Sequence, residues 1–155
     1  MTWIAPVLRA HDADPAQSAR AAASWFLRLF SWPYDDPALR ALAATDVIGS
    51  SDLLIIECQR VLQRERLAAH IDDQQYAESV ASLERIVGQL HLIEIGPAVK
   101  RRAAGPFPTV IGTLDAIHLA SALLWADTEP ENDPVILTLD KQLALCARAL
   151  GLRIA

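Results

Sequence analysis

Residues 112–126 read GTLDAIHLASALLWA, and residues 135–151 read VILTLDKQLALCARALG. Both contain Thr-Leu-Asp, and in both the aspartate opens a strongly apolar run with helical spacing. The segment VILTL, which precedes the second aspartate, is typical of a short buried strand. A strand that leads directly into a helix is the repeating unit of a parallel sheet, so this part of the chain favours an α/β fold.

The rest of the chain continues the alternation of short apolar segments with helical patterns. We expect a short edge or first strand within residues 2–10 and further strands over 45–49, 91–95 and 152–155. Further helices are expected over 16–30, 38–43, 52–70 and 72–90, and a helix followed by a loop over 96–112. Ser50 or Ser51 is the expected cap of the helix over 52–70, and Asp72 or Asp73 the expected start of the next. This order predicts a mostly parallel sheet in one domain that covers residues 1–155.

The overall composition restricts the class of protein. The chain has 155 residues and an apolar fraction of 52%, which suits a single domain with its own core. No apolar run reaches the roughly 20 residues that span a bilayer, and the N-terminus lacks the pattern of a secretion signal. Cys58 and Cys146 have no CxxC partners, which favours buried free thiols in a reducing cytosol over a disulfide. We therefore expect a cytoplasmic protein with no membrane contact.

The net charge of −5 argues against a protein that holds nucleic acid mainly through a basic patch. It is compatible with an enzyme whose phosphate contacts run through a bound cation, and it suits a basic partner protein. The Lys-Arg-Arg cluster at 100–102 is short, and we interpret it as a solvated face rather than an RNA contact. Walker A, dinucleotide-binding and Ser-His-Asp motifs are absent from the sequence.

Three carboxylates stand in apolar surroundings. Asp115 falls in the first turn of an apolar helix, where it either stabilises the helix dipole or lies at the edge of a core. Asp140 follows the strand VILTL, at the end of a strand where open parallel sheets bind ligands. Glu57 lies on or near the apolar stripe of its helix, so it requires a partner: either a salt bridge to Arg60 or Arg64, or a metal.

These three acids could converge on one hard divalent cation, because Mg²⁺ and Mn²⁺ prefer oxygen ligands. Such an ion would orient water for phosphodiester cleavage. His118 follows Asp115 by three residues, which is the spacing of a carboxylate–histidine metal motif. The sequence has no second motif of that kind, so a packed histidine is the preferred interpretation of His118.

Three segments, in this order, resemble a known family: SSDLLIIECQRVLQR, TLDAIHLASAL and VILTLDKQLALCARALGLRI. The chain from Val47 to Ile154 resembles the PIN domain, especially the VapC-type toxins of bacterial toxin–antitoxin pairs. The resemblance implies a three-layer α/β/α sandwich with a parallel sheet. It also implies a Mg²⁺- or Mn²⁺-dependent ribonuclease that cleaves RNA, is inhibited by a cognate antitoxin and forms a homodimer.

Residue by residue, the resemblance assigns the metal-binding and catalytic carboxylates of the family to Glu57, Asp115 and Asp140. Thr138 matches the small hydroxyl residue that supports the last of these.

The start of the chain departs from the family. PIN domains normally begin with a strand that ends in a metal-binding aspartate, whereas TWIAPVLRA has no acid. Depending on the alignment, Ala5 or Trp3 stands at that position. The chain is therefore a degenerate member, a deliberately inactivated variant, or an enzyme in which Asp12 or Asp14 compensates. The alternative function is a catalytically inactive PIN-like scaffold that serves as a protein-binding module.

Overall fold

A parallel sheet of five strands forms the centre of the part of the chain that the structure describes. The computed structural model describes residues 2–4, 47–128, 134–138 and 140–154. Its strands are β1 (Thr2–Ile4), β2 (Ile48–Ser51), β3 (His91–Ile93), β4 (Val135–Leu137) and β5 (Arg153–Ile154). They lie in the order β3-β2-β1-β4-β5, and every neighbouring pair is parallel. The prediction of a parallel sheet is confirmed, and TWI is its central strand.

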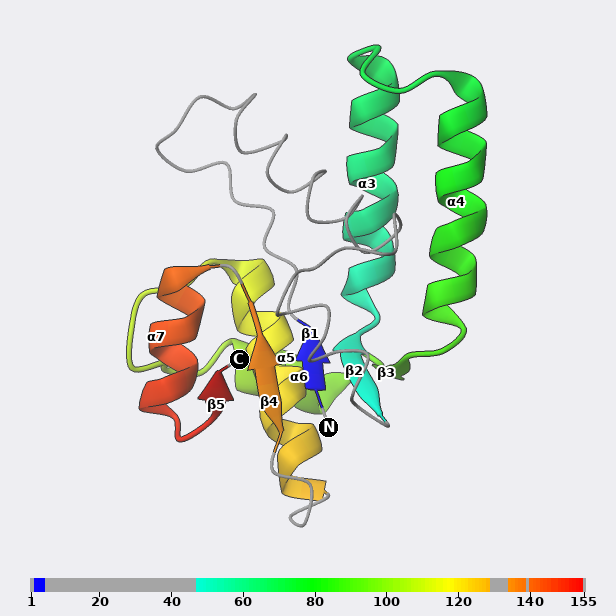
Figure 1. Ribbon diagram of the computed structural model, residues 1–155. Helices are drawn as coiled ribbons and strands as arrows, with labels where there is room; N and C mark the ends of the chain where they lie inside the picture. Colours follow the sequence, from blue (N-terminus) through cyan, green and yellow to red (C-terminus); the bar gives the residue numbers. More distant parts are fainter. Residues whose placement is uncertain (1, 5–46, 129–133, 139, 155) are drawn as a thin grey trace.

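Five helices connect the described strands: α3 (Leu53–Leu67), α4 (Asp73–Val87), α5 (Pro97–Ala103), α6 (Thr113–Thr128) and α7 (Lys141–Ala149). The crossover from β2 to β3 moves toward one edge of the sheet, while those from β3 to β4 and from β4 to β5 move toward the other. Because such crossovers are right-handed, opposite directions place helices on opposite faces. The architecture is the predicted three-layer α/β/α sandwich, with α3 and α4 as a hairpin that extends past the sheet (Figure 1).

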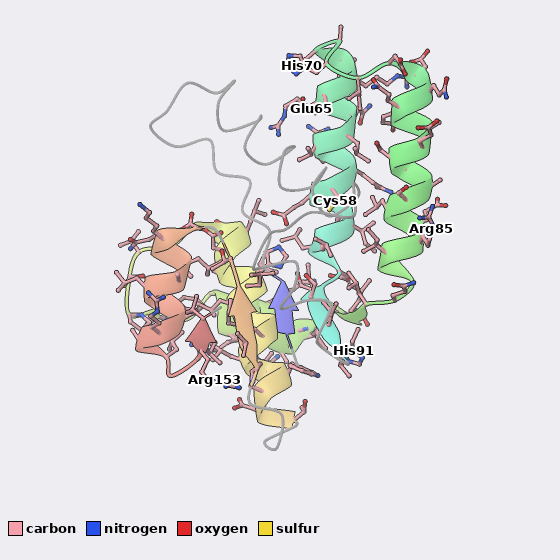
Figure 2. All side chains as sticks on the ribbon, in the orientation of Figure 1. Cys58, Glu65, His70, Arg85, His91 and Arg153 are labelled. Carbon is pink, nitrogen blue, oxygen red and sulfur yellow. The ribbon has the colours of Figure 1, made fainter. Side chains whose placement is uncertain are left out.

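Two clusters of side chains make up the described core. One joins α6, β4 and α7 through Leu119, Trp125, Ile136, Leu143 and Cys146. The other fills the seam between α3 and α4 through Leu54, Cys58, Leu62 and Leu83. Figure 2 shows Cys58 in this seam. Both cysteines are buried and free, as the sequence predicts.

The start of α3 differs from the prediction. Ser50 and Ser51 are not helix caps: β2 continues through both, and both side chains are fully buried. Asp52 takes the N-cap position without a side-chain capping bond. The reason is that Ser51 pairs with Ile93 in the sheet and directs its hydroxyl to His118. At α4, by contrast, Asp72 forms a full capping box with Gln75, which confirms the predicted start of that helix.

Two expectations lie outside the described residues: the helices over 16–30 and 38–43, and the possible compensation by Asp12 or Asp14. Among the described helices, none is long and apolar enough to cross a membrane.

Candidate functional site

The candidate acids belong to the carboxyl edge of the sheet. Ile4 is level with Leu137 in the pairing of β1 with β4, so the chain leaves both strands at the same edge. The direction of the crossovers reverses at this pair, which makes it the topological switch point where open parallel sheets bind ligands. Ser51 ends β2 at this edge, and its contact with His118 places the first turns of α6 there as well.

Glu57, His118 and Ser51 form a buried hydrogen-bonded chain that joins α3, α6 and β2. His118 Nε2 lies 2.7 Å from Glu57 Oε2, and His118 Nδ1 lies 2.9 Å from Ser51 Oγ. Ser51 and His118 are fully buried, and Glu57 is 4% exposed. A carboxylate only accepts hydrogen bonds, so Nε2 donates to Glu57, and in a neutral ring Nδ1 then accepts from the Ser51 hydroxyl. The preferred interpretation of His118 as a packed histidine is confirmed.

The second oxygen of Glu57 has a different environment. Within the described part of the chain, Oε1 is buried and has no hydrogen-bond partner. The expected alternative, an ion pair with Arg60 or Arg64, is wrong for the described residues, because both arginines are exposed and His118 is the partner of Glu57. An unsatisfied buried carboxylate oxygen is destabilising unless another group engages it. Glu57 therefore has one oxygen held by His118 and one buried oxygen that no described residue engages.

Asp115 lies in the first turn of α6 and is 4% exposed. Its Oδ2 accepts a hydrogen bond of 3.2 Å from the backbone N–H of Gly112, just before the helix. This confirms the prediction that Asp115 stands at the edge of a core and at a helix start. Asp115 also precedes His118 by one helical turn, so it lies on the same side of α6 as the partner of Glu57.

Asp140 is the N-cap of α7. Its Oδ1 accepts hydrogen bonds from the backbone N–H groups of Gln142 and Leu143, at 2.6 and 2.8 Å. Its own backbone N–H donates to Thr138 Oγ1 at 3.1 Å, so Thr138 supports the position of Asp140. A capping role for Asp140 is established by these contacts. Its role as a metal ligand stays a prediction.

Two residues at this edge escaped sequence-based prediction. Ser51 is 67 residues away from its partner His118, and nothing in either local pattern signals the contact. Asp52 Oδ2 accepts from the Ile95 backbone N–H at 3.4 Å, and its Oδ1 is a second buried oxygen without a partner among the described residues. Asp52 directly follows a buried strand, a position typical of ligand-binding residues. The sequence pattern also fits the start of the following helix, and that interpretation concealed the first one.

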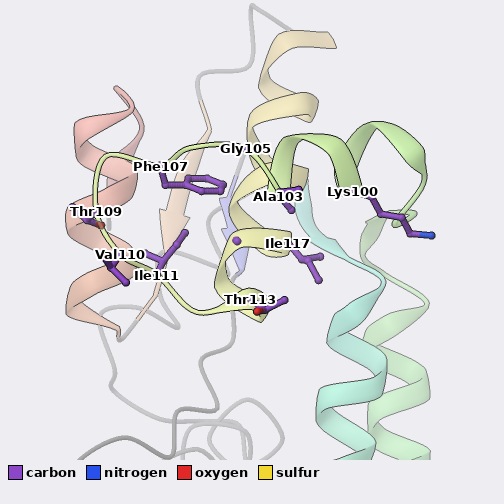
Figure 3. A pocket seen from close by; sticks show the side chains of 11 residues that line it. Lys100, Ala103, Gly105, Phe107, Thr109, Val110, Ile111, Thr113 and Ile117 are labelled. Carbon is purple, nitrogen blue, oxygen red and sulfur yellow. The ribbon is translucent and has the colours of Figure 1, made fainter.

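An apolar cavity of about 490 Å³ adjoins the first turns of α6 (Figure 3). It lies between the end of α5, the following loop and α6, with Phe107, Ile111 and Ile117 among its walls. None of the three candidate acids lines it. Lys100 at its edge is exposed, as is Arg101, whereas the Arg102 guanidinium lies 4.5 Å above the Phe107 ring. The interpretation of 100–102 as a solvated face is thus correct for Lys100 and Arg101, and Arg102 packs on the loop.

Comparison with known proteins identifies the family. The PIN domain family matches residues 21–149, which is most of the chain. The chain therefore belongs to the PIN domain family, whose members are typically nucleases that need divalent metal ions. The match begins after β1, so it leaves out the strand that lacks an acid. No curated protein matches the chain at a significant level.

The residues of the site fit a divalent cation in part. The described residues contain no group of three or more His, Cys, Asp or Glu side chains placed to hold a metal. Mg²⁺, however, is commonly bound by one or two carboxylates, with water and substrate phosphate completing its ligands. Glu57 and Asp115 supply two buried carboxylates, and the unpartnered Glu57 Oε1 is the oxygen ligand that such an ion prefers.

Proposed function

We propose that this protein is a metal-dependent endoribonuclease of the toxin–antitoxin type. Glu57, Asp115 and Asp140 would hold a Mg²⁺ or Mn²⁺ ion at the carboxyl edge of the sheet. The observation that carries the proposal is the buried Glu57 carboxylate, with one oxygen held by His118 and the other without a partner among the described residues. When bound, such an ion activates water for attack on an RNA phosphodiester and neutralises charge on the departing oxygen.

The chain's own residues would prepare this edge in different ways. His118 holds Glu57 in place, and the N–H of Gly112 fixes one oxygen of Asp115. Asp140 holds the start of α7 through its Oδ1, and it would be the third ligand. Asp115 lies in the first turn of α6, Asp140 caps α7, and Glu57 lies in the second turn of α3. These positions suit a substrate that approaches from the carboxyl edge of the sheet.

Recognition of a cognate antitoxin, formation of a homodimer and a cytoplasmic location belong to the same proposal. They rest on the resemblance of residues 47–154 to VapC-type toxins. The net charge of −5 suits a partner with a basic binding segment. Light scattering after size-exclusion chromatography measures the mass of the purified chain, and a monomer at micromolar concentration would remove the homodimer from the proposal.

The decisive experiment compares the natural chain with Ala5→Asp. Residue 5 directly follows β1, the strand that pairs with β2 and β4. Cleavage of a structured RNA is measured with Mn²⁺, and Mn²⁺ binding is measured separately by calorimetry. We expect Ala5→Asp to bind Mn²⁺ more tightly and to cleave faster than the natural chain. If neither protein binds Mn²⁺ or cleaves RNA, the nuclease proposal is wrong.

A second candidate function is a catalytically inactive PIN scaffold that binds a partner protein. Two observations favour it: no acid precedes Asp12 in the sequence, and the described residues gather no three-acid cluster. When the natural chain is compared with Ala5→Asp, this candidate predicts that the natural chain cleaves no RNA with any divalent metal. It also predicts that Ala5→Asp leaves partner binding unchanged, because the scaffold would not depend on the metal site.

A further inference from the structure

We propose that Ser51 and His118 are positioning residues that determine which oxygen of Glu57 is offered to a ligand. The inference rests on the proposed function for the identity of that ligand, a divalent cation. It rests on the structure for the chain of contacts, in which the Ser51 hydroxyl donates to His118 Nδ1 and His118 Nε2–H donates to Glu57 Oε2. In this arrangement Oε2 is occupied, and Oε1 has no hydrogen-bond partner within the described part of the chain.

The three residues sit on three different elements. Ser51 ends β2, Glu57 lies in the second turn of α3, and His118 lies in the second turn of α6. Because all three side chains are buried, the imidazole cannot rotate without breaking a contact on either side. A glutamate side chain has several rotatable bonds, and the bond to Nε2 removes that freedom. The carboxylate is thus oriented before any cation arrives, which is what a supporting residue contributes to a metal site.

A nucleophilic role for Ser51 does not fit this arrangement. A hydroxyl, an imidazole and a carboxylate in sequence have the composition of a hydrolytic triad. Ser51 and His118 are, however, fully buried, so no substrate reaches the hydroxyl. The hydrogen-bonded chain of Ser51, His118 and Glu57 therefore orients the Glu57 carboxylate and does not act on a substrate.

The hydrogen-bonded chain requires two atoms at residue 118, one that contacts Ser51 and one that donates to Glu57. Gln places an N–H donor near the position of Nε2, so His118→Gln keeps the bond to Glu57. Asn places its amide near Nδ1, so His118→Asn keeps a contact with Ser51 and loses the bond to Glu57. The two variants are similar in polarity and smaller than or equal to histidine in size, which makes them a matched pair. Ser51→Ala removes only the hydroxyl and leaves the hydrogen bond between His118 and Glu57 with both of its partners.

The first test is nuclear magnetic resonance of the full chain without metal. The ¹⁵N shifts of His118 are expected to show a proton on Nε2, and Glu57 is expected to hold a single side-chain rotamer. Glu57 should keep that rotamer in His118→Gln and average among rotamers in His118→Asn. A ring protonated only at Nδ1, or one rotamer of Glu57 in every variant, would overturn the positioning role. Ser51→Ala, the mildest change, should keep the proton on Nε2, because the Glu57 carboxylate still accepts from it.

The second test is the affinity of the same proteins for Mn²⁺ alone, measured by electron paramagnetic resonance. Loss of a supporting hydrogen bond weakens metal binding by roughly 10- to 100-fold, so the Mn²⁺ affinity of His118→Asn should fall by that factor. The Mn²⁺ affinity of His118→Gln should stay within about threefold of that of the natural chain. Thermal unfolding of each variant separates this effect from loss of the fold. Equal Mn²⁺ affinity in all three proteins would overturn the inference and leave the proposed cation site standing. If neither the natural chain nor Ala5→Asp binds Mn²⁺ but Glu57 loses its rotamer in His118→Asn, the positioning role holds and the proposed function fails.

Discussion

Glu57 and His118 are 61 residues apart in the chain, yet their Oε2 and Nε2 atoms lie 2.7 Å apart in the interior. The contact ties the helix after β2 to the helix before β4, and so joins the two halves of a doubly wound sheet. Ser51 completes the connection from the end of β2. A polar chain of this kind fixes the position of the Glu57 carboxylate at the carboxyl edge of the sheet.

The contact with His118 predicts that Glu57 contributes to the stability of the fold. Glu57→Ala leaves the buried Nε2–H of His118 without an acceptor, and we expect it to lower the free energy of unfolding by about 1–3 kcal/mol. Glu57→Gln keeps an acceptor oxygen and should lower it by less than about 1 kcal/mol. Urea denaturation followed by circular dichroism measures both. Glu84→Ala, an exposed acid of α4, should change stability little, and equal losses in all three variants would contradict the assignment.

Asp140 has two possible roles that one pair of variants can separate. Asn is as good an N-cap as Asp, so Asp140→Asn should preserve stability, while Asp140→Ala should lose about 0.5–2 kcal/mol from the two lost bonds to Gln142 and Leu143. If Asp140 also binds a cation, Asp140→Asn should lose most of the Mn²⁺ affinity despite its intact fold. Calorimetric titration with Mn²⁺ is the measurement. Unchanged affinity in Asp140→Asn would leave Asp140 with its capping role alone.

The local patterns of the sequence predicted the elements well. Alternation of apolar segments and amphipathic helices is a short-range signal, and it predicted β1, β4, α4 and the parallel arrangement. The apolar character of 113–126 correctly predicted that Asp115 is buried.

The long-range contacts could not be predicted in the same way. Ser50 and Ser51 fit the statistics of helix caps, but the sheet pairing of β2 and the hydroxyl bond to His118 override that preference. Arg60 was a reasonable partner for Glu57, because i and i+3 are neighbours on a helix. The actual partner comes from another helix, and only the three-dimensional arrangement brings it close.

The thiol of Cys58 makes stability depend on pH in the alkaline range. Burial, and then the charge of Glu57, raise the pKa of the Cys58 thiol far above its ordinary value. The folded protein therefore keeps this proton while the unfolded chain releases it above about pH 8.5, so stability is full below that pH and falls as pH rises, by up to about 1.4 kcal/mol per pH unit. Unfolding free energies from pH 7 to 10 measure this slope.

Cys58→Ala isolates the contribution of that thiol. The variant should be less stable at every pH because of the lost side chain, but its stability should fall less steeply above pH 8.5 than that of the natural chain. Other groups that titrate in this range affect both proteins alike. Parallel curves for the two proteins would mean that the thiol ionises as readily in the folded state as in the unfolded state.

The hairpin of α3 and α4 depends on its apolar seam. Leu62 is 2% exposed within the seam, whereas Leu67, on the last turn of the same helix, is 81% exposed. Leu62→Ala should lower the free energy of unfolding by about 2–5 kcal/mol, and Leu67→Ala should change it by no more than about 0.5 kcal/mol. Both are measured by urea denaturation. Similar losses would show that burial in the seam does not decide the stability of this hairpin.

Asp115 allows the sharpest test of the cation site itself. Asp115→Asn keeps an oxygen that can accept from the Gly112 N–H, so the start of α6 should persist. It removes one negative charge from a buried position, and a neutral amide is a much poorer ligand for a hard divalent ion than a carboxylate. We therefore expect a fold and thermal stability close to those of the natural chain, together with a loss of Mn²⁺ affinity of roughly tenfold or more. The measurements are circular dichroism during heating and calorimetric titration with Mn²⁺.

The same change in the Ala5→Asp background extends the test to catalysis. If that background cleaves RNA, adding Asp115→Asn should abolish cleavage while leaving the protein folded, because the ion and not the helix start depends on the charge. Thr113→Ala, two residues away on an exposed part of the same turn, serves as the neutral comparison and should retain both Mn²⁺ binding and cleavage. Full cleavage by the Asp115→Asn protein would exclude Asp115 as a ligand and shift the site toward Glu57 and Asp140.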